Sequence, residues 1–313
     1  NQKNDGKQLM QKFELTVLGS GSALPTNNRN PSAQLLNIAE RFFLIDCGEG
    51  TQVQLRKFKA SFRKIDYILI SHLHGDHYFG LIGLLQSFHL LGRKKKLKLF
   101  CPVELKNIIE IQNKASQTDL NFDVEYHFTN PDAFELIFED NKVEVFSFPL
   151  KHRIPCTGFL FREKKWPRKI IKEKLIENNI SISEIHKIKS GLDPLNEHGM
   201  VVPLDELTVD SPSPRSFAYC SDTVYDEELI QYVCGVDLLY HESTFLSDMQ
   251  DRAKKTMHST ASDAGIIAQK SSVKTLLIGH FSSRYTDDAK FLEEVKPVFS
   301  NSLLATEGKV YSV

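Results

Sequence analysis

The chain has 313 residues, of which 41% are hydrophobic and 25% are charged, and its formal net charge at pH 7 is −1. This balance is typical of a globular protein long enough to bury a sizeable core. It excludes a polycation that holds nucleic acid by overall charge, so a nucleic-acid partner would need local basic patches.

The five cysteines are widely spaced and form no CxxC pair. This usage argues against a disulfide framework or a structural zinc site and favours a reducing cytoplasm. No apolar run approaches the roughly 18 residues of a bilayer-spanning helix, and no signal-peptide hydrophobic region opens the chain. We therefore expect a cytoplasmic protein with no membrane segment. Residues 1–9 are polar and are expected to be a tail or an expression remnant, which leaves 10–313 for one catalytic domain.

Short apolar runs predict strands, and amphipathic stretches between them predict helices. The predicted strands are 13–19, 33–38, 42–48, 66–72, 96–102, 143–150, 216–222, 237–243 and 273–280. The predicted helices lie near 50–58, 77–91, 103–115, 225–233, 260–271 and 286–298. The alternation indicates a mixed α/β chain.

Polar residues able to bind a metal follow several predicted strands at the point where each strand ends. The segments are SHLHGDH (71–77), CSD (220–222), HES (241–243) and GHF (279–281). Open α/β sheets place their sites in the crevice outside the strand ends. We therefore expect these four segments to meet in one site.

The first of these segments contains His72, His74, Asp76 and His77. Residues two apart in extended backbone point the same way, so His72 and His74 are placed to hold one cation. Asp76 and His77 follow a turn permitted by Gly75 and are placed to face a second cation. Nitrogen and oxygen donors in this ratio suit Zn²⁺, with Mn²⁺ or Fe as alternatives. A histidine-rich surface loop is the simpler alternative.

The H-x-H-x-D-H pattern after a strand resembles the signature of the metallo-β-lactamase fold superfamily. The resemblance implies an α/β fold of the αββα four-layer sandwich type. In the dinuclear hydrolases of the superfamily a later His, a bridging Asp and a last His complete the site, and His152, Asp222 and His280 match them in order. The implied ligands are His72, His74 and His152 for one zinc, Asp76, His77 and His280 for the other, and Asp222 bridging both.

Four further segments resemble the ribonuclease Z family, the endonucleases that cut precursor tRNA near its 3′ end. They are 19–33 with Arg29 and Asn30, HESTF at 241–245, HST at 258–260, and 279–285 with Arg284. The resemblance covers the chain from about residue 12. It implies a zinc-dependent endoribonuclease that leaves a 3′-hydroxyl on the tRNA and a 5′-phosphate on the trailer, and that acts as a homodimer.

The same resemblance implies roles for individual residues. Asp76 would orient the attacking hydroxide and accept its proton, His258 would donate a proton to the leaving 3′ oxygen, and Glu242 would hold the His258 imidazole in the required tautomer. Arg29, Asn30 and Arg284 are expected to contact RNA.

Residues 162–200 lie where the family carries an inserted tRNA-binding arm. The segment 162–189 is rich in lysine and arginine and predicts two short helices outside the core. Lys164, Lys165, Arg168 and Lys169 cluster beside Trp166, a pattern suited to binding phosphates. The Gly-Pro pair common near the tip of bacterial short-form arms does not occur here. A solvated helical pair without an RNA partner is the alternative.

Two other functions are open to the chain. One is a metal-dependent hydrolase of small phosphodiesters or thioesters on the same fold, because the fold does not name the substrate. The other is a non-catalytic RNA-binding protein, against which the full ligand set argues. The basic insertion discriminates the nuclease from the small-molecule hydrolase.

Overall fold

A computed structural model describes residues 11–60 and 62–313. The expected tail at 1–9 lies outside these residues. The described chain forms two compact units. The larger contains the residues up to Arg162 together with Arg215–Val313, and the smaller is Glu163–Pro214.

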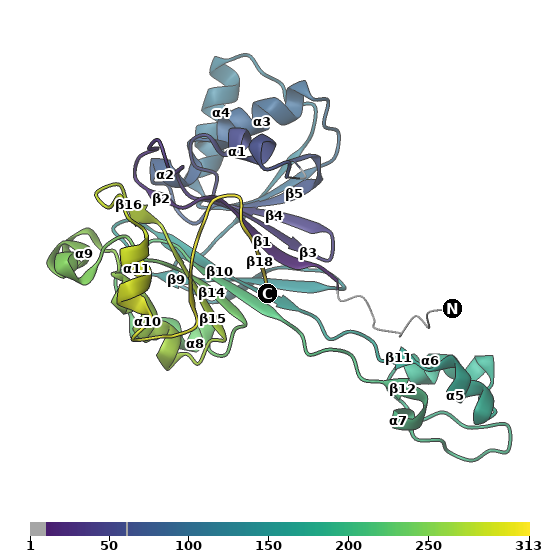
Figure 1. Ribbon diagram of the computed structural model, residues 1–313. Coiled ribbons are helices and arrows are strands. Elements are labelled where there is room, and N and C mark those ends of the chain that lie inside the picture. Colours follow the sequence, from purple (N-terminus) through teal and green to yellow (C-terminus); the bar gives the residue numbers. More distant parts are fainter. Residues whose placement is uncertain (1–10, 61) are drawn as a thin grey trace. The chain divides into compact units, whose positions relative to one another are not determined.

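Two mixed sheets form the centre of the larger unit (Figure 1). The first has the order β18 (Val310–Ser312), β1 (Phe13–Gly19), β3 (Ala33–Ile38), β4 (Arg41–Ile45), β5 (Ile65–Leu69), β6 (Leu97–Cys101) and β7 (Val124–Phe128). The second has the order β17 (Ser302–Leu304), β15 (Thr275–Gly279), β14 (Leu238–Glu242), β13 (Ser216–Cys220), β10 (Cys156–Glu163), β9 (Val143–Leu150) and β8 (Glu135–Glu139).

Aromatic side chains fill the space between the two sheets. Phe43 of β4 meets Phe161 of β10 edge to face, with ring centroids 5.3 Å apart, and Tyr219 stacks on Tyr240 at 4.8 Å. These four rings belong to one buried cluster with residues of both sheets. Edge-to-face and offset-stacked aromatic pairs are favourable beyond the area they bury. The rings therefore fix the spacing of the sheets.

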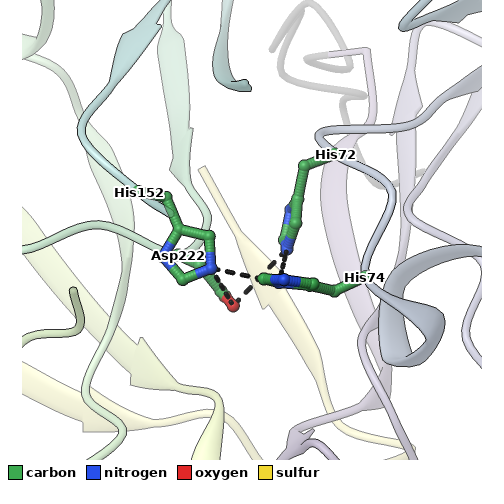
Figure 2. A group of neighbouring side chains, drawn as sticks. All are labelled: His72, His74, His152 and Asp222. Atoms are coloured by element: carbon green, nitrogen blue, oxygen red, sulfur yellow. Dashed lines mark hydrogen bonds and ion pairs between the residues drawn. The ribbon is translucent and has the colours of Figure 1, made fainter. Parts of the chain in front are cut away.

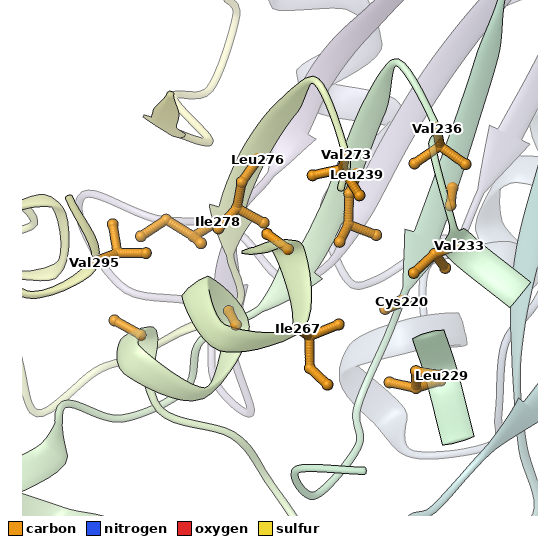
Figure 3. Packing of buried hydrophobic residues seen from close by; sticks show 14 of the residues in the cluster. Cys220, Leu229, Val233, Val236, Leu239, Ile267, Val273, Leu276, Ile278 and Val295 are labelled. Carbon is orange, nitrogen blue, oxygen red and sulfur yellow. The ribbon is translucent and has the colours of Figure 1, made fainter. Parts of the chain in front are cut away.

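Helices cover the outer face of each sheet (Figure 1). The first sheet carries α1 (Thr51–Lys57), α2 (Gly75–Tyr78), α3 (Leu81–Leu90) and α4 (Glu104–Ala115), and the second carries α8 (Ile230–Val233), α10 (Ala261–Lys270) and α11 (Ala289–Val295). The short helix α9 (Gln250–Thr256) lies to one side of the second sheet. Figure 3 shows the apolar layer between the second sheet and its helices, to which Leu239, Ile267 and Leu276 contribute. The predicted αββα sandwich is confirmed.

Parallel strands direct their carboxyl ends to one edge of each sheet. In the first sheet β4, β5, β6 and β7 run parallel, and in the second sheet β13, β14, β15 and β17 do. The loops after β5, β13 and β15 carry His72, Asp222 and His280. A short pair, β2 (Gly21–Ser22) with β16 (Phe281–Ser282), joins the loop after β1 to the loop after β15.

The predicted strands 13–19, 33–38 and 143–150 match β1, β3 and β9. Strand β10 was missed, although it is buried along almost its whole length. Strands β7 and β8 were also missed, because they lie at the sheet edges and have few buried residues to create a pattern. The single helix expected at 77–91 is broken at Phe79–Gly80 into α2 and α3.

The smaller unit has its own short core. It contains β11 (Lys169–Ile170) paired with β12 (Thr208–Val209), and the helices α5 (Lys172–Glu177), α6 (Ile185–Lys189) and α7 (Leu204–Leu207). Ile188, Val202 and Leu207 are buried within it. The unit reaches Pro214, past the expected boundary at 200, because β12 supplies the partner strand of β11.

The smaller unit interrupts a hairpin. Strands β10 and β13 pair antiparallel, and Arg162, the last residue before the unit, lies opposite Ser216, the second residue after it. Among residues 11–60 and 62–313, none of the helices has the length and apolar character that a membrane crossing requires.

This pairing predicts that the larger unit folds without the smaller one. Replacing Lys164–Pro214 with Asn-Gly closes β10 and β13 through a two-residue turn of a type that suits antiparallel strands. We expect one cooperative thermal transition, with a melting temperature within about 5 °C of the intact chain, a shift equivalent to roughly 1–2 kcal/mol. Circular dichroism during heating measures it. As a control, Phe161→Ala in the intact chain removes a buried ring and should cost about 3–5 kcal/mol. Loss of the cooperative transition in the deletion variant would contradict independent folding.

Candidate metal centre

The metal-binding segment after β5 changes conformation between its two pairs of candidate ligands. His74 has extended backbone, with φ −73° and ψ 145°, and helix α2 begins at the next residue. His72 and His74 are therefore two positions apart before the helix, whereas Asp76 and His77 lie within its first turn. This change of backbone directs the two pairs toward different groups of partners.

The first group joins His72 and His74 to residues from the second sheet (Figure 2). The Nδ1 atom of His74 lies 3.1 Å from Nε2 of His72 and 3.1 Å from Nε2 of His152. Asp222 Oδ2 lies 3.6 Å from His72 Nε2 and 3.7 Å from His152 Nε2. Three imidazole nitrogens and a carboxylate oxygen thus converge on one small volume.

The second group joins Asp76 and His77 to His280. The Nε2 atoms of His77 and His280 are 3.3 Å apart, and Asp76 Oδ2 lies 3.4 Å from His280 Nε2. The other oxygen of Asp222, Oδ1, lies 3.3 Å from His77 Nε2 and 3.2 Å from His280 Nε2. The two oxygens of Asp222 therefore face the two groups, one oxygen to each.

The donor set fits a pair of divalent cations. Asp222 Oδ1 is buried without a hydrogen-bond partner in the described part of the chain, a costly state for a carboxylate unless a cation lies beside it. Imidazole and carboxylate donors at these positions suit Zn²⁺, Mn²⁺ or Fe²⁺.

The ring nitrogens that face away from the two groups have protein partners. His72 Nδ1 lies 3.0 Å from Ser71 Oγ, His77 Nδ1 2.8 Å from Asp46 Oδ2, His152 Nδ1 2.8 Å from the Met257 carbonyl, and His280 Nδ1 2.8 Å from Thr244 Oγ1. Metal-ligating histidines use their second nitrogen in this way, which fixes the tautomer and the ring orientation.

Burial and nearby charge favour the protonation states that a metal requires. Burial lowers the pKa of His72, His74 and His152, so these imidazoles are neutral at pH 7. Despite burial, the charges of His280 and His77 hold the pKa of Asp222 well below its usual range. Metal ligands bind as neutral imidazoles and ionised carboxylates, which are the forms favoured here.

His77 differs from these histidines. Burial lowers its pKa, but the carboxylates of Asp222, Asp76 and Asp46 outweigh burial and raise that pKa well above the ordinary value. Positive charge is therefore favoured at this position. A divalent cation beside Asp76 and Asp222, which face Nε2 of His77, would supply that charge and leave the imidazole neutral.

Asp46 is a functional candidate that the sequence analysis missed. It follows β4 with φ +57°, is fully buried, and accepts hydrogen bonds from His77 Nδ1 and the Tyr219 hydroxyl, both at 2.8 Å, and from the Ser71 amide at 2.8 Å. It therefore links a candidate ligand of the first sheet to β13 of the second. Asp46 could have been found from the sequence, because it is a polar residue at the end of an apolar strand, the same pattern that identified Asp222 and His280.

Glu242 and His258 lie together, as the resemblance implied. Glu242 Oε1 accepts from His258 Nδ1 at 2.8 Å, although the residues are 16 positions apart. Burial lowers the pKa of His258, but the carboxylates of Glu242 and Asp222 raise it to about 9. The Thr244 hydroxyl, also missed from sequence, lies 2.7 Å from Glu242 Oε2 and 2.8 Å from His280 Nδ1. It connects the Glu242–His258 pair to the second group of candidate ligands.

A cleft of about 400 Å³ opens onto the centre. His74, Asp76, Asp222 and His258 line it together with Leu24, Phe79 and Arg153. The backbone amide of Ala23, from the loop after β1, donates to Asp76 Oδ2 at 2.7 Å. A substrate phosphate entering this cleft would meet both groups of candidate ligands.

The expected RNA-contact residues near the centre lie in two different environments. Arg29 is only 8% exposed and binds the Tyr285 carbonyl and Asp288, while the amide and side chain of Asn30 bind Glu307 at 2.6 and 2.8 Å. These contacts join their loop to the last part of the chain, so that any RNA contact by Arg29 would have to compete with Asp288. Arg284 is exposed.

Of the four expected contacts in the smaller unit, Arg168 is neutralised by acidic neighbours. It pairs with Asp205 at 2.5 Å and Asp210 at 2.8 Å. Lys165 and Lys169 are exposed, and Lys164 is partly buried. The guanidinium of Arg168 is therefore already paired, and a phosphate would have to compete with two carboxylates for it.

The sequence is similar to those of known nucleases over nearly its full length. The chain is 46% identical to the ribonuclease Z of Phocaeicola vulgatus, over 95% of the chain and 96% of that protein. It is 47% identical to the ribonuclease Z of Cytophaga hutchinsonii, over 96% of each. A family model described as "Anti-Pycsar protein Apyc1" matches residues 13–165.

Solved structures show the same architecture. The short form of human tRNase Z has a TM-score of 0.71 and 28% sequence identity, covering 96% of this chain and 99% of that one. The metallo-β-lactamase fold protein YhfI of Bacillus subtilis has a TM-score of 0.68 and 18% identity, covering 97% and 100%. The second likeness is one of fold alone.

The contact between Asp46 and His77 predicts the effect of removing one charge. We expect Asp46→Asn to weaken zinc binding by about 10–100-fold, because it removes the carboxylate that orients the His77 imidazole and raises its basicity. Competition with a chromogenic chelator measures the affinity. Asp123→Asn, at an exposed position, is the matched control. Unchanged zinc affinity in a folded Asp46→Asn protein would contradict this role.

Proposed function

The chain belongs to the ribonuclease Z family, and we propose that it is a metal-dependent endoribonuclease that removes the 3′ trailer from precursor tRNA. The products are a 3′-hydroxyl on the tRNA and a 5′-phosphate on the trailer. The observation that carries this proposal is the meeting of six histidine and aspartate side chains around Asp222 in a chain of this family.

The proposed cofactor is two Zn²⁺ per subunit. His72, His74 and His152 would hold one ion, Asp76, His77 and His280 the other, and Asp222 would bridge them. Bound there, two divalent cations offset charge on the phosphoryl oxygens and lower the pKa of water toward neutrality. The convergence of donors and the orphaned Asp222 Oδ1 support this assignment.

The chain's own residues supply proton transfer and orientation. Asp76 borders the cleft and would accept the proton of the attacking water, and the amide of Ala23 holds its carboxylate in place. His258 also borders the cleft and would donate a proton to the leaving 3′ oxygen. The Glu242 carboxylate accepts a hydrogen bond from Nδ1 of His258. The other ring nitrogen, Nε2, is therefore the one that would donate the proton to the leaving oxygen. General acid catalysis of this kind contributes roughly 10²–10⁴-fold.

The smaller unit is proposed to be the arm that holds tRNA. Its 8 lysines and arginines all lie in 164–189, whereas from residue 190 to 214 its charged side chains at pH 7 are acidic. The whole unit, with 9 aspartates and glutamates, is therefore not basic, and RNA binding would use its first half. Lys165 and Lys169, both exposed, are the proposed phosphate contacts. Arg168 supports them from within the unit.

We further propose that the protein acts as a homodimer in the cytoplasm. The dimer follows from the family, in which the arm of one subunit serves the centre of the other. Five free cysteines, four of them buried, support a reducing compartment.

The direct test is cleavage of one precursor tRNA with a 3′ extension, mapped to the nucleotide. Zinc-loaded protein should make a single cut just after the discriminator base. The cut should disappear with Asp76→Ala, which deletes a candidate ligand of the second group, and with a chelator, which withdraws the metal ions from the protein. Hydrolysis of a small chromogenic phosphodiester without any cut in the tRNA would overturn the proposal in favour of a small-molecule hydrolase on the same centre.

The arm makes a second prediction. The Lys164–Pro214 replacement described above should lower kcat/KM for precursor tRNA by at least about 10³-fold, as expected when several phosphate contacts are lost. It should leave hydrolysis of a small phosphodiester within about twofold, because the candidate ligands all lie in the other unit. Equal loss of both activities in a folded variant would argue against a separate arm.

A further inference from the structure

We propose that Phe79 and Arg153 form a subsite for one unpaired nucleotide beside the metal centre, with the base stacked on Phe79 and an adjacent phosphate paired with Arg153. The inference rests on the proposed function and specifies how RNA next to the cut is held. Both side chains line the same cleft as Asp76 and His258.

Phe79 is an apolar ring held at the surface. It follows α2 directly and is 63% exposed, although exposing a large apolar side chain gives up the stability its burial would add. Its ring meets that of Tyr78 edge to face, with centroids 5.1 Å apart. An exposed aromatic ring with fixed neighbours in a cleft is suited to stacking on a base.

Gly75 explains how the ring is held. A Cβ atom at Gly75 would lie 2.2–2.6 Å from three atoms of the Phe79 ring, so the ring occupies the space that a side chain would take. Gly75 is not among the residues with positive φ, so the turn between the ligand pairs does not require glycine, contrary to the expectation from sequence. The glycine instead lets Phe79 pack directly against the backbone of the metal-binding segment.

Arg153 brings a cation to the same cleft from the second sheet. It directly follows the candidate ligand His152, is exposed, and has no carboxylate within ion-pair distance among the described residues. Among the described residues that line the cleft, it is the one lysine or arginine. A guanidinium without a carboxylate partner presents two parallel N–H groups that match a phosphate.

The size of the cleft limits the ligand. A volume of about 400 Å³ lies near the lower end of the range for small-ligand sites, roughly 300–1,000 Å³. This space suits one nucleotide rather than a duplex. Leu24 and Pro25, on the loop after β1, add apolar surface to the same cleft. The chemistry offered next to the hydrolytic groups is therefore an aromatic face, apolar walls, one cation and the exposed carboxylate of Glu49.

The test pairs each side chain with the RNA group it contacts. In one precursor series an abasic unit replaces each nucleotide flanking the cut, and in another a neutral methylphosphonate replaces each phosphate flanking the scissile one. Wild type should lose about tenfold in kcat/KM at one abasic position, the effect of one stacked base. Phe79→Leu should lose a similar factor on normal RNA and nothing further on the abasic RNA, whereas Phe79→Tyr should behave as wild type. Arg153→Gln should likewise lose activity on normal RNA and lose nothing further when one particular phosphate is replaced by a methylphosphonate. The activity of Arg153→Lys should lie between those of wild type and Arg153→Gln.

Matched controls and a binding measurement separate the outcomes. Phe128→Leu and Arg63→Gln alter an exposed phenylalanine and an exposed arginine outside the cleft, and should match wild type on every substrate. Fluorescence anisotropy with single-stranded RNA of about eight nucleotides reads binding without cleavage. Weaker binding by Phe79→Leu and Arg153→Gln, with no cut of precursor tRNA by wild type, would uphold the subsite and overturn the proposed function. Normal cleavage and binding by both variants, or a Phe79→Leu effect confined to subunit association, would overturn the subsite.

Discussion

The two carboxylate oxygens of Asp222 face two different groups of imidazoles, and much of the molecule is arranged around that contact. A buried carboxylate is tolerated only where positive charge and hydrogen bonds compensate the loss of water. The imidazoles around it come from both sheets: His72 and His77 follow β5, and His152 and His280 follow strands of the second sheet. The cations proposed to bind between them would supply the missing positive charge. The centre therefore requires the two sheets to meet at one fixed separation, and the aromatic layer between them sets it.

A set of hydrogen bonds around the ligands turns this convergence into a rigid site. Asp46 holds the His77 ring and also accepts from Tyr219, so that one carboxylate spans the sheets. Thr244 contacts both His280 and Glu242, and Glu242 in turn holds His258. A displacement of any one of these groups would shift its hydrogen-bond partner. The proposed proton donor and the proposed metal ligands are therefore positioned by a shared network.

The sequence predicted which side chains would meet at the candidate metal centre. The candidate ligands could be found because a dense histidine segment and single polar residues each follow an apolar strand, and parallel strands bring such ends to one edge. The Glu242–His258 pair was available only through family resemblance, since a separation of 16 residues carries no distance information. Arg29 and Arg168 could not be judged from sequence, because the carboxylates that neutralise them, Asp288 and Asp205, are distant along the chain. The position of Phe79 could not be predicted from sequence either. A phenylalanine in an apolar segment gives no sign that its ring packs on Gly75 and lines the cleft.

The place at which the smaller unit enters the chain has a consequence for how such enzymes diversify. Arg162 and Ser216 are paired neighbours in adjacent strands, so the chain leaves the sheet and returns to it at one point. Lengthening or exchanging what lies between them leaves the strand register untouched, and the entropy of closing a longer loop grows only slowly with its length. The smaller unit, proposed here to recognise the substrate, can thus change in size and charge while the candidate metal centre keeps its geometry.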